Sequence, residues 1–329
     1  MRKLKPFLAV CLAVVSLHFV FFSSCIGQIC REILGIDEGN YLFKSSLDLS
    51  DDAEADSFPT EIPLPNESAP VQSTAPTEKN IVPTTIAGGL SIKNSTSYVV
   101  DARELLSNGC SIRLESGKPQ ILIVHTHSSE AYSPAGLDRY DDTGANRTQD
   151  NNYNVIRIGD ELYRLLTEQG LEVIHDRGCY DYPSYTGSYN RSGEAVEKYL
   201  AEYPSICIVI DLHRDALGTD DVTYKTVATE SGVCASQLMF VMGSDEGGLD
   251  YPNWKDNLSL ALYLQNAVLA KYPSLMRPVT LVGYRYNQHL TSGSMILEVG
   301  SNGNTLQEAL AAIRLFADAA GPALLKLVE

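Results

Sequence analysis

Unbroken apolar runs alternate with amphipathic stretches in the second half of the chain. Residues 121–124 are apolar, and residues 206–212 are apolar except for Asp211; both runs are rich in β-branched side chains, a pattern typical of strands buried on both faces. Between them, residues 154–169 carry apolar side chains at helical spacing, and Gly170 follows where helices commonly end. Strands that alternate with helices of this length predict an α/β fold with a mostly parallel twisted sheet flanked by helices.

The same alternation continues to the end of the chain. Further strands are expected at 171–175, 238–242 and 294–299, and further helices at 192–203, 254–271 and 305–328. This pattern predicts one folded domain over residues 105–329.

The N-terminal segment has a different pattern. The basic start MRKLK precedes residues 7–30, which contain no Asp, Glu, Lys or Arg and are long enough to cross a bilayer. The basic residues predict that segment 1–30 is a single-pass transmembrane anchor and that the rest of the chain lies outside the cytoplasm. A cleaved secretory signal and a lipoprotein signal at Cys25 are the alternatives.

Residues 31–104 are expected to be a disordered linker between the anchor and the domain. They are rich in Asp, Glu, Ser, Pro and Thr, and residues 36–95 contain ten acidic residues and three lysines. Such a segment buries too little apolar surface to offset the entropy lost on ordering. The linker would hold the domain at a distance from the membrane.

Composition narrows the function classes further. The net charge is −16, which argues against a nucleic-acid partner because phosphate binding requires basic patches. The seven cysteines form no C-x-x-C pattern and have no regular spacing, so neither a zinc ribbon nor a disulfide framework is expected.

Three of the apolar strands end in polar residues that can bind a metal ion. The stretches ILIVHTHSSE, CIVIDLHRDA and SMILEVGSNGN carry, in this order, His125, His127 and Glu130; Asp211, His213, Arg214 and Asp215; and Glu298. Because the carboxyl ends of parallel strands meet at one edge of a sheet, these side chains are expected to converge there.

Two histidines and one glutamate form a ligand set typical of catalytic zinc, with one position left for water. His127, Glu130 and His213 are the predicted ligands of a Zn²⁺ ion. Zinc lowers the pKa of its bound water and polarises a carbonyl group. A further carboxylate is then needed to carry the proton of this water to the leaving amine, and Glu298 is predicted to do so.

Several roles stay open at this point. His125 either replaces His127 as the ligand or packs beside the site. Asp211 and Asp215 are expected to orient His213 through its second ring nitrogen, as zinc-bound histidines usually require. Each of these residues has a purely structural alternative as a hydrogen-bonding group at a strand end.

Other polar residues near the strand ends are expected to contact a substrate. Arg214, Asn302 and Asn304 are predicted to hold the substrate or a tetrahedral oxyanion. Glu298 has a structural alternative as an ion-pair partner of Arg214 or Arg285. The tyrosine-rich stretch CYDYPSYTGSYN is either a packed loop or the wall of a groove for a carbohydrate or peptide.

These motifs resemble, in their order along the chain, those of the stage II sporulation protein P family. HTHSSEAY, YNVIRIGDEL, VIDLHRDA and RYNQHLTSGSMILEVGSNGN follow one another within residues 120–309. The resemblance implies a fold similar to zinc-dependent N-acetylmuramoyl-L-alanine amidases and a membrane-anchored hydrolase of peptidoglycan. It also implies amidase and endopeptidase action in septal wall thinning and engulfment during sporulation, alongside the sporulation proteins D and M.

The family's site residues can be carried over position by position. Its first histidine and glutamate fall on His127 and Glu130, its third ligand on His213 and its catalytic glutamate on Glu298. Amidases often take the middle ligand from the start of the first long helix, where this chain has Asn154; this departure favours Glu130. The rival functions are a zinc carboxypeptidase or endopeptidase of stem peptides and a non-catalytic wall-binding scaffold.

Overall fold

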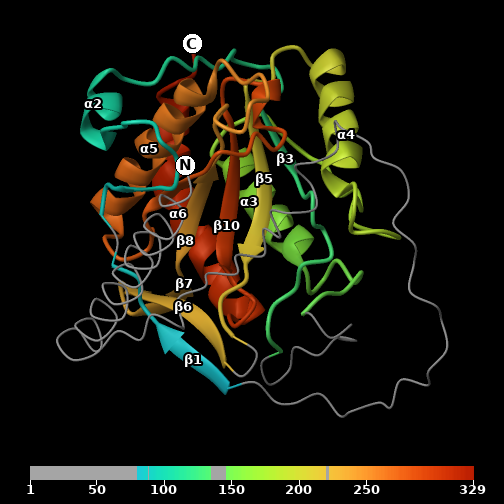
Figure 1. Cartoon of the computed structure of the whole chain (residues 1–329), viewed down its shortest axis with the longest axis vertical. Helices are drawn as coiled ribbons and strands as arrows, with labels where there is room; N and C mark the ends of the chain where they lie inside the picture. Colours follow the sequence, from blue (N-terminus) through green and yellow to red (C-terminus); the bar gives the residue numbers. More distant parts are fainter. Residues whose placement is uncertain (1–79, 88, 135–145, 220–221) are drawn as a thin grey trace, which may run out of the picture. The chain divides into compact units, whose positions relative to one another are not determined.

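The computed structural model describes residues 80–87, 89–134, 146–219 and 222–329 (Figure 1). The predicted anchor and most of the predicted linker lie outside these ranges. None of the helices within them is long and apolar enough to span a membrane.

The described residues form a main sheet of seven strands and a smaller sheet of three. In spatial order, the main sheet contains β2 (Ile92–Asn94), β9 (Val279–Leu281), β8 (Leu238–Met242), β10 (Ser294–Ser301), β5 (Ile208–Asp215), β3 (Ile121–Val124) and β4 (Val173–His175). The small sheet contains β1 (Asn80–Thr84), β6 (Val222–Glu230) and β7 (Val233–Ser236). The helices are α2 (Ala102–Ser107), α3 (Val155–Glu168), α4 (Ser188–Glu202), α5 (Trp254–Lys271), α6 (Leu306–Leu325) and the 3₁₀ turn η1 (Gln288–Leu290).

The main sheet is mixed, although most of its strand pairs are parallel. Strands β4, β3, β5 and β10 all run in one direction, as their sequence patterns predict. Strand β8 runs antiparallel to β10, and β9 and β2 follow the direction of β8. The reversal follows from the small sheet: β7 ends at Ser236, and β8 enters beside Val299, near the carboxyl end of β10. The expected parallel sheet therefore corresponds to the half that carries the predicted site residues.

The two faces of the main sheet are covered differently. Strand residues such as Ile123, Ile210 and Leu297 belong to a large apolar core that also contains residues of α3, α5 and α6. The neighbouring residues Val124 and Val209 point to the other face, into a smaller cluster with α4. In the view of Figure 1, α4 and α5 stand on opposite sides of the strands. This alternation means that odd-numbered residues of β5 face α4.

The folded part of the chain begins earlier than the sequence predicts. The linker was expected to continue to residue 104, but β1 pairs with β6 and β2 pairs with β9. Helix α2 also packs against α5. Strands as short as β2 leave no readable apolar period, and their backbone hydrogen bonds are made with distant segments. The boundary predicted at residue 105 is therefore corrected to a folded region that includes Asn80.

Helix α3 begins and ends almost where the sequence predicts. The Asn154 side chain caps its first turn by accepting a hydrogen bond from the Ile156 N–H at 3.0 Å. Gly170, with φ of 95°, follows the helix in a conformation that other residues rarely adopt. Thr305 and Glu308 cap α6 reciprocally, so that both helices are fixed directly beside the strand ends.

Candidate functional site

The carboxyl ends of β5 and β10 place His213 and Glu298 side by side. These two residues are register partners in the parallel pairing of the strands. Asp211 lies two residues before His213, and period-two alternation brings both side chains to the face covered by α4. All three residues are buried. The predicted convergence of these two strand ends is therefore present in the structure.

The turn after β3 brings His127 and Glu130 to the same place. The His127 and His213 rings are nearly perpendicular, with centroids 5.3 Å apart. Glu130 Oε2 lies 3.4 Å from His213 Nδ1 and also accepts a hydrogen bond from the backbone N–H of Arg214 at 3.1 Å. His127 and Glu130 thus lie beside His213, and all three predicted ligand residues are buried.

Asp211 is the carboxylate that lies beside His213. Its Oδ1 atom is 2.9 Å from His213 Nε2, and its two oxygens accept hydrogen bonds from the Thr126 N–H and hydroxyl. Asp215, which was expected to share this role, instead forms a buried ion pair with Arg277 at 2.8 Å. Asp211 is therefore the carboxylate of β5 that is positioned to orient the histidine.

His125 points away from these residues. Its Nδ1–H donates to the Leu212 carbonyl at 3.0 Å, and its Nε2 lies 2.9 Å from Nε2 of His175. The rings pack against α3 at Gly159, where an added Cβ would come within 2.6 Å of His125 Nε2. Of the two histidines in HTHSSE, the structure therefore places His127 next to His213 and His125 elsewhere.

The charges within the site act on one another. Burial lowers the pKa of His213, but the carboxylates of Asp211 and Glu130 outweigh this and hold that pKa well above its usual range. Burial, reinforced by the charge of His213, lowers the pKa of His127 to about 4. Burial raises the pKa of Glu298 well above its usual range, and the nearby Asp215 adds to the effect. Glu298 is thus a carboxyl group that readily holds a proton.

The three residues expected to bind substrate make bonds within the protein. The Arg214 guanidinium is buried and donates to the backbone carbonyls of Ala131 and Asn146 at 2.7 and 3.1 Å. Asn302 Oδ1 accepts from the Leu217 N–H at 3.1 Å. These contacts indicate that Arg214 and Asn302 stabilise the loops around the site.

Asn304 is buried between the small sheet and α6. Its Nδ2 donates to the Thr226 carbonyl at 2.9 Å and to Glu308 Oε2 at 3.0 Å, and its Oδ1 accepts from the Ser301 N–H at 2.9 Å. This network holds the turn after β10 against β6. The sequence pattern showed that the asparagine lies near the strand end, but not that its amide faces inward.

Arg147 and Asp181, which the sequence patterns did not identify, lie at the edge of the site. Arg147 Nη1 is 3.1 Å from Asp181 Oδ2, and its Nη2 is 3.4 Å from Glu130 Oε1. The Arg147 guanidinium also lies over the ring of Tyr185, which stacks on His127 at 4.3 Å. The tyrosine-rich stretch therefore forms one wall of the site. A single arginine in a polar loop gives no sequence signal for this position.

The donor atoms of the site fit a cation in their chemistry. Among the described residues, both carboxylate oxygens of Glu298 are buried without a hydrogen-bond partner, an arrangement that is uncommon for buried polar atoms. Two imidazoles and a carboxylate, from His127, His213 and Glu130, are ligands that zinc commonly takes. Across the described ranges, no three His, Cys, Asp or Glu side chains already stand in a metal-binding geometry.

Asn154 does not belong to this donor set. Its side chain caps α3, and its Nδ2 also donates to the Thr148 carbonyl at 3.1 Å. The backbone N–H of Val155 donates to the Glu130 carbonyl at 2.8 Å, so this helix start supports the turn that carries Glu130.

Comparison with known proteins gives one family. The sequence model of the family described as stage II sporulation protein P matches residues 37–321. The stage II sporulation protein P of Bacillus subtilis (strain 168) is 29% identical over 216 residues. That match covers 61% of this chain and 50% of the relative, so the chain spans about half the length of the curated relative.

Solved structures of amidases also match. An N-acetylmuramoyl-L-alanine amidase of Nostoc punctiforme shares 17% identity, with 64% of this chain and 97% of the other covered and a TM-score of 0.37. An amidase of Mycobacterium smegmatis shares 14% identity, with coverage of 64% and 98% and a TM-score of 0.38. The CwlD amidase of Clostridioides difficile, solved with the GerS lipoprotein, shares 14% identity, with coverage of 63% and 98% and a TM-score of 0.37.

Proposed function

Because this chain belongs to the stage II sporulation protein P family, we propose that it is a zinc-dependent hydrolase of peptidoglycan that acts during sporulation. The bond that it cleaves is the amide between N-acetylmuramic acid and L-alanine. The observation that carries this proposal is the pairing of His213 with Glu298, whose buried carboxylate has no hydrogen-bond partner. A carboxylate with this environment can accept a proton and release it again.

His127, Glu130 and His213 would hold the zinc ion. When bound, zinc supplies an acidified water and polarises the amide carbonyl. The Asp211 carboxylate, itself held by Thr126, fixes the orientation of the His213 ring. Such a carboxylate beside a ligand histidine usually strengthens metal binding.

Glu298 carries the proton through the reaction. Its carboxylate takes a proton from the attacking water at one of its two unpaired oxygens. The same oxygen then gives this proton to the amine nitrogen of L-alanine as the amide bond breaks. The raised pKa of Glu298 favours the second step, because burial disfavours its charged form. One residue thus acts first as a base and then as an acid.

The remaining parts of the proposal concern location and partners. The apolar run of residues 7–30 supports a single-pass anchor that leaves the catalytic domain outside the cytoplasm, at the sporulation septum. Peptidoglycan is the substrate there, and the sporulation proteins D and M are the proposed partners in engulfment. Cleavage of stem-peptide cross-links is a second activity of the same site in this proposal.

The Glu298→Gln variant tests the proposed chemistry. Glutamine keeps the shape of the side chain but cannot transfer the proton, so release of peptide from purified peptidoglycan should fall at least about a thousand-fold. Mass spectrometry of the products of the unaltered protein should show glycan strands without peptide. The control is Glu161→Gln, a buried glutamate bound to Arg164 and Arg314. That variant should lose stability and retain the activity of its folded fraction.

Other outcomes identify the rival functions. Shortened stem peptides that stay attached to muramic acid, without any peptide-free glycan, would indicate a carboxypeptidase or endopeptidase. Full wild-type activity in the Glu298→Gln protein, together with less than one equivalent of bound zinc, would rule out the proposed mechanism. Binding to peptidoglycan without any cleavage would favour a scaffold.

A further inference from the structure

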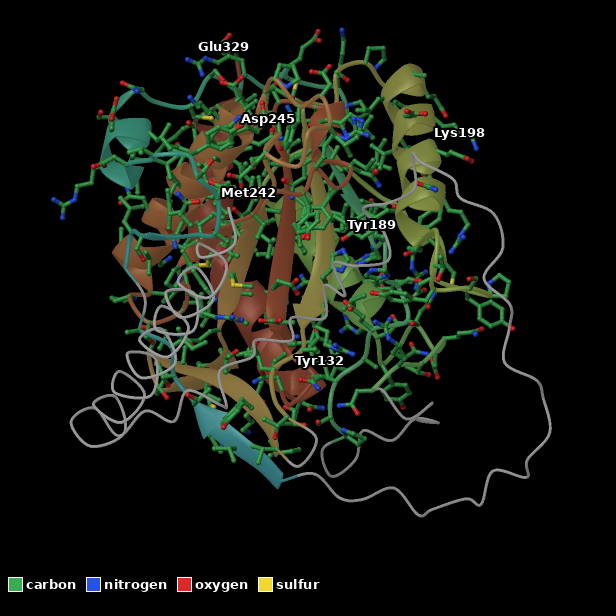
Figure 2. The ribbon with its side chains drawn as sticks, viewed as in Figure 1. Tyr132, Tyr189, Lys198, Met242, Asp245 and Glu329 are labelled. Atoms are coloured by element: carbon green, nitrogen blue, oxygen red, sulfur yellow. The ribbon has the colours of Figure 1, made fainter. Side chains whose placement is uncertain are left out.

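Tyr189 lies in the first turn of α4, beside His127. Gly187, with φ of 80°, turns the chain into the helix, and Asn287 Nδ2 fixes this turn by donating to the Tyr189 carbonyl at 2.8 Å. Figure 2 draws Tyr189 between helix α4 and the strands of the main sheet. Its ring is nearly perpendicular to that of His127, with centroids 5.5 Å apart. The tyrosine is therefore part of the wall of the proposed active site.

The hydroxyl group of Tyr189 has no hydrogen-bond partner within the described residues. The side chain is 7% exposed, and the oxygen is inaccessible to solvent. Buried tyrosine hydroxyls usually find a partner, because leaving one unpaired lowers the stability of the folded protein. Phenylalanine would fill the same space without this cost. The chain thus retains a hydroxyl group that the folded protein itself does not satisfy.

Aromatic rings of the site surround this tyrosine. Its ring lies against the rings of His127 and Tyr286, with centroids 5.5 and 5.4 Å away. A tyrosine hydroxyl keeps its proton at physiological pH, because the ordinary pKa of this group is about 10. It can therefore donate to an acceptor that enters the site beside His127.

We propose that Tyr189 is a catalytic residue whose hydroxyl donates a hydrogen bond to the carbonyl oxygen of the substrate amide. This inference rests on the proposed amidase function. When water adds to the carbonyl carbon, the oxygen gains negative charge, and the hydrogen bond from Tyr189 strengthens. The proton stays on the tyrosine throughout, so the step is stabilisation of charge and not proton transfer. A donor in place before the reaction stabilises this charge without reorganisation.

The Tyr189→Phe variant tests this role on a soluble glycan fragment that carries stem peptides. We expect kcat to fall about 100-fold, the effect of losing one oxyanion donor, while KM changes less than about twofold. The melting temperature should rise by about 2–4 °C because the unpaired buried hydroxyl is gone. Gain of stability with loss of turnover distinguishes a catalytic hydroxyl from a structural one.

Tyr251→Phe is the matched control. Tyr251 is also buried, but its hydroxyl accepts from Asn257 Nδ2 at 2.5 Å and donates to Gln288 Oε1 at 3.3 Å. Removal of this satisfied hydroxyl should lower the melting temperature and leave kcat unchanged. Each variant removes one tyrosine hydroxyl. Among the described residues, the hydroxyl of Tyr189 has no hydrogen-bond partner, whereas that of Tyr251 has two.

Two results would overturn the role of Tyr189. One is a Tyr189→Phe protein that turns over at the wild-type rate, and the other is a lowered melting temperature with loss of activity in proportion to unfolding. A wild-type protein that releases no peptide-free glycan would instead reject the proposed function. The two failures are thus told apart by the behaviour of the unaltered protein.

Discussion

Two pairs of histidines lie near the carboxyl ends of β3, β4 and β5, and their surroundings differ. His127 and His213 face α4, and the two ring nitrogens of His213 lie 2.9 Å from Asp211 Oδ1 and 3.4 Å from Glu130 Oε2. His125 and His175 face α3 and bond to each other at 2.9 Å. Burial is similar in both pairs, so burial alone does not distinguish them.

The pairs differ in the charge of the groups around them. His125 donates to a backbone carbonyl, which leaves its other nitrogen free to accept from His175. Burial lowers the pKa of His125 to about 3 and that of His175 to about 4, so both stay neutral. Gly159 makes room for them within α3, at the cost that glycine brings to a helix. This pair is neutral and bonded within itself, whereas the pair facing α4 lies beside the carboxylates of Asp211, Glu130 and Glu298.

Replacing His127 by alanine should have the largest effect on activity. If His127 holds zinc, peptide release from peptidoglycan should fall at least about a thousand-fold, and bound zinc should fall with it. The measurements are product mass spectrometry and metal analysis of the purified protein. A variant with normal zinc content and activity would transfer the ligand role to another residue, and His125→Ala is the comparison that identifies it.

The His125→Ala variant should show the opposite behaviour. It leaves a cavity and removes the bonds to the Leu212 carbonyl and to His175, so the free energy of unfolding should fall by about 2–4 kcal/mol. Urea denaturation measures this loss. The folded fraction should retain zinc and activity within a few-fold of the wild type.

Gly159→Ala disturbs the same histidine pair from the helix side. An added Cβ would lie 2.5 Å from His175 Nε2 and 2.6 Å from His125 Nε2. Alanine normally stabilises a helix by about 1 kcal/mol relative to glycine, so a loss of stability would confirm that the histidines occupy this space. If Gly159→Ala were stabilising, the packing argument for His125 would be wrong.

The sequence patterns predicted those parts of the fold that depend on local periodicity. Unbroken apolar runs located β3, β5 and β10, and helical spacing located α3 and α5 within a few residues. The small sheet and strands β1 and β2 were not predicted, because they are short and depend on distant partners. The direction of β8 depends on the position of β7, from which the chain enters β8. A local sequence pattern does not predict this direction.

The candidate site shows the same division. That the strand ends meet was predictable, since parallel strands share an edge. Alternation along β5 also shows that Arg214 and His213 point to opposite faces, a signal that could have excluded Arg214 from the site. Arg277, however, reaches Asp215 from 62 residues along the chain, and Arg147 reaches Glu130 from 17 residues away. Such contacts depend on tertiary structure, which spacing alone does not reveal.

The last predicted effect is a change in how stability depends on pH. Burial, reinforced by the charge of Arg177, lowers the pKa of His175 from 6.5 to about 4 in the folded state. Between these values the unfolded chain binds a proton at His175 and the folded protein does not. The wild type should therefore lose stability as the pH falls from 6.5 towards 4, by up to about 1.4 kcal/mol per pH unit from this residue.

Replacing His175 by glutamine removes this titration and should flatten the curve. Urea denaturation at pH 8, 6.5 and 5, with zinc chelated, compares the two proteins. The variant should be less stable than the wild type at pH 8, because the bond to His125 is weakened, and the difference should shrink towards pH 5. Parallel curves for the two proteins would mean that His175 has its ordinary pKa in the folded state. His175 would then be protonated at weakly acidic pH. The neutral charge of the pair facing α3 would no longer distinguish it from the pair that contains His213.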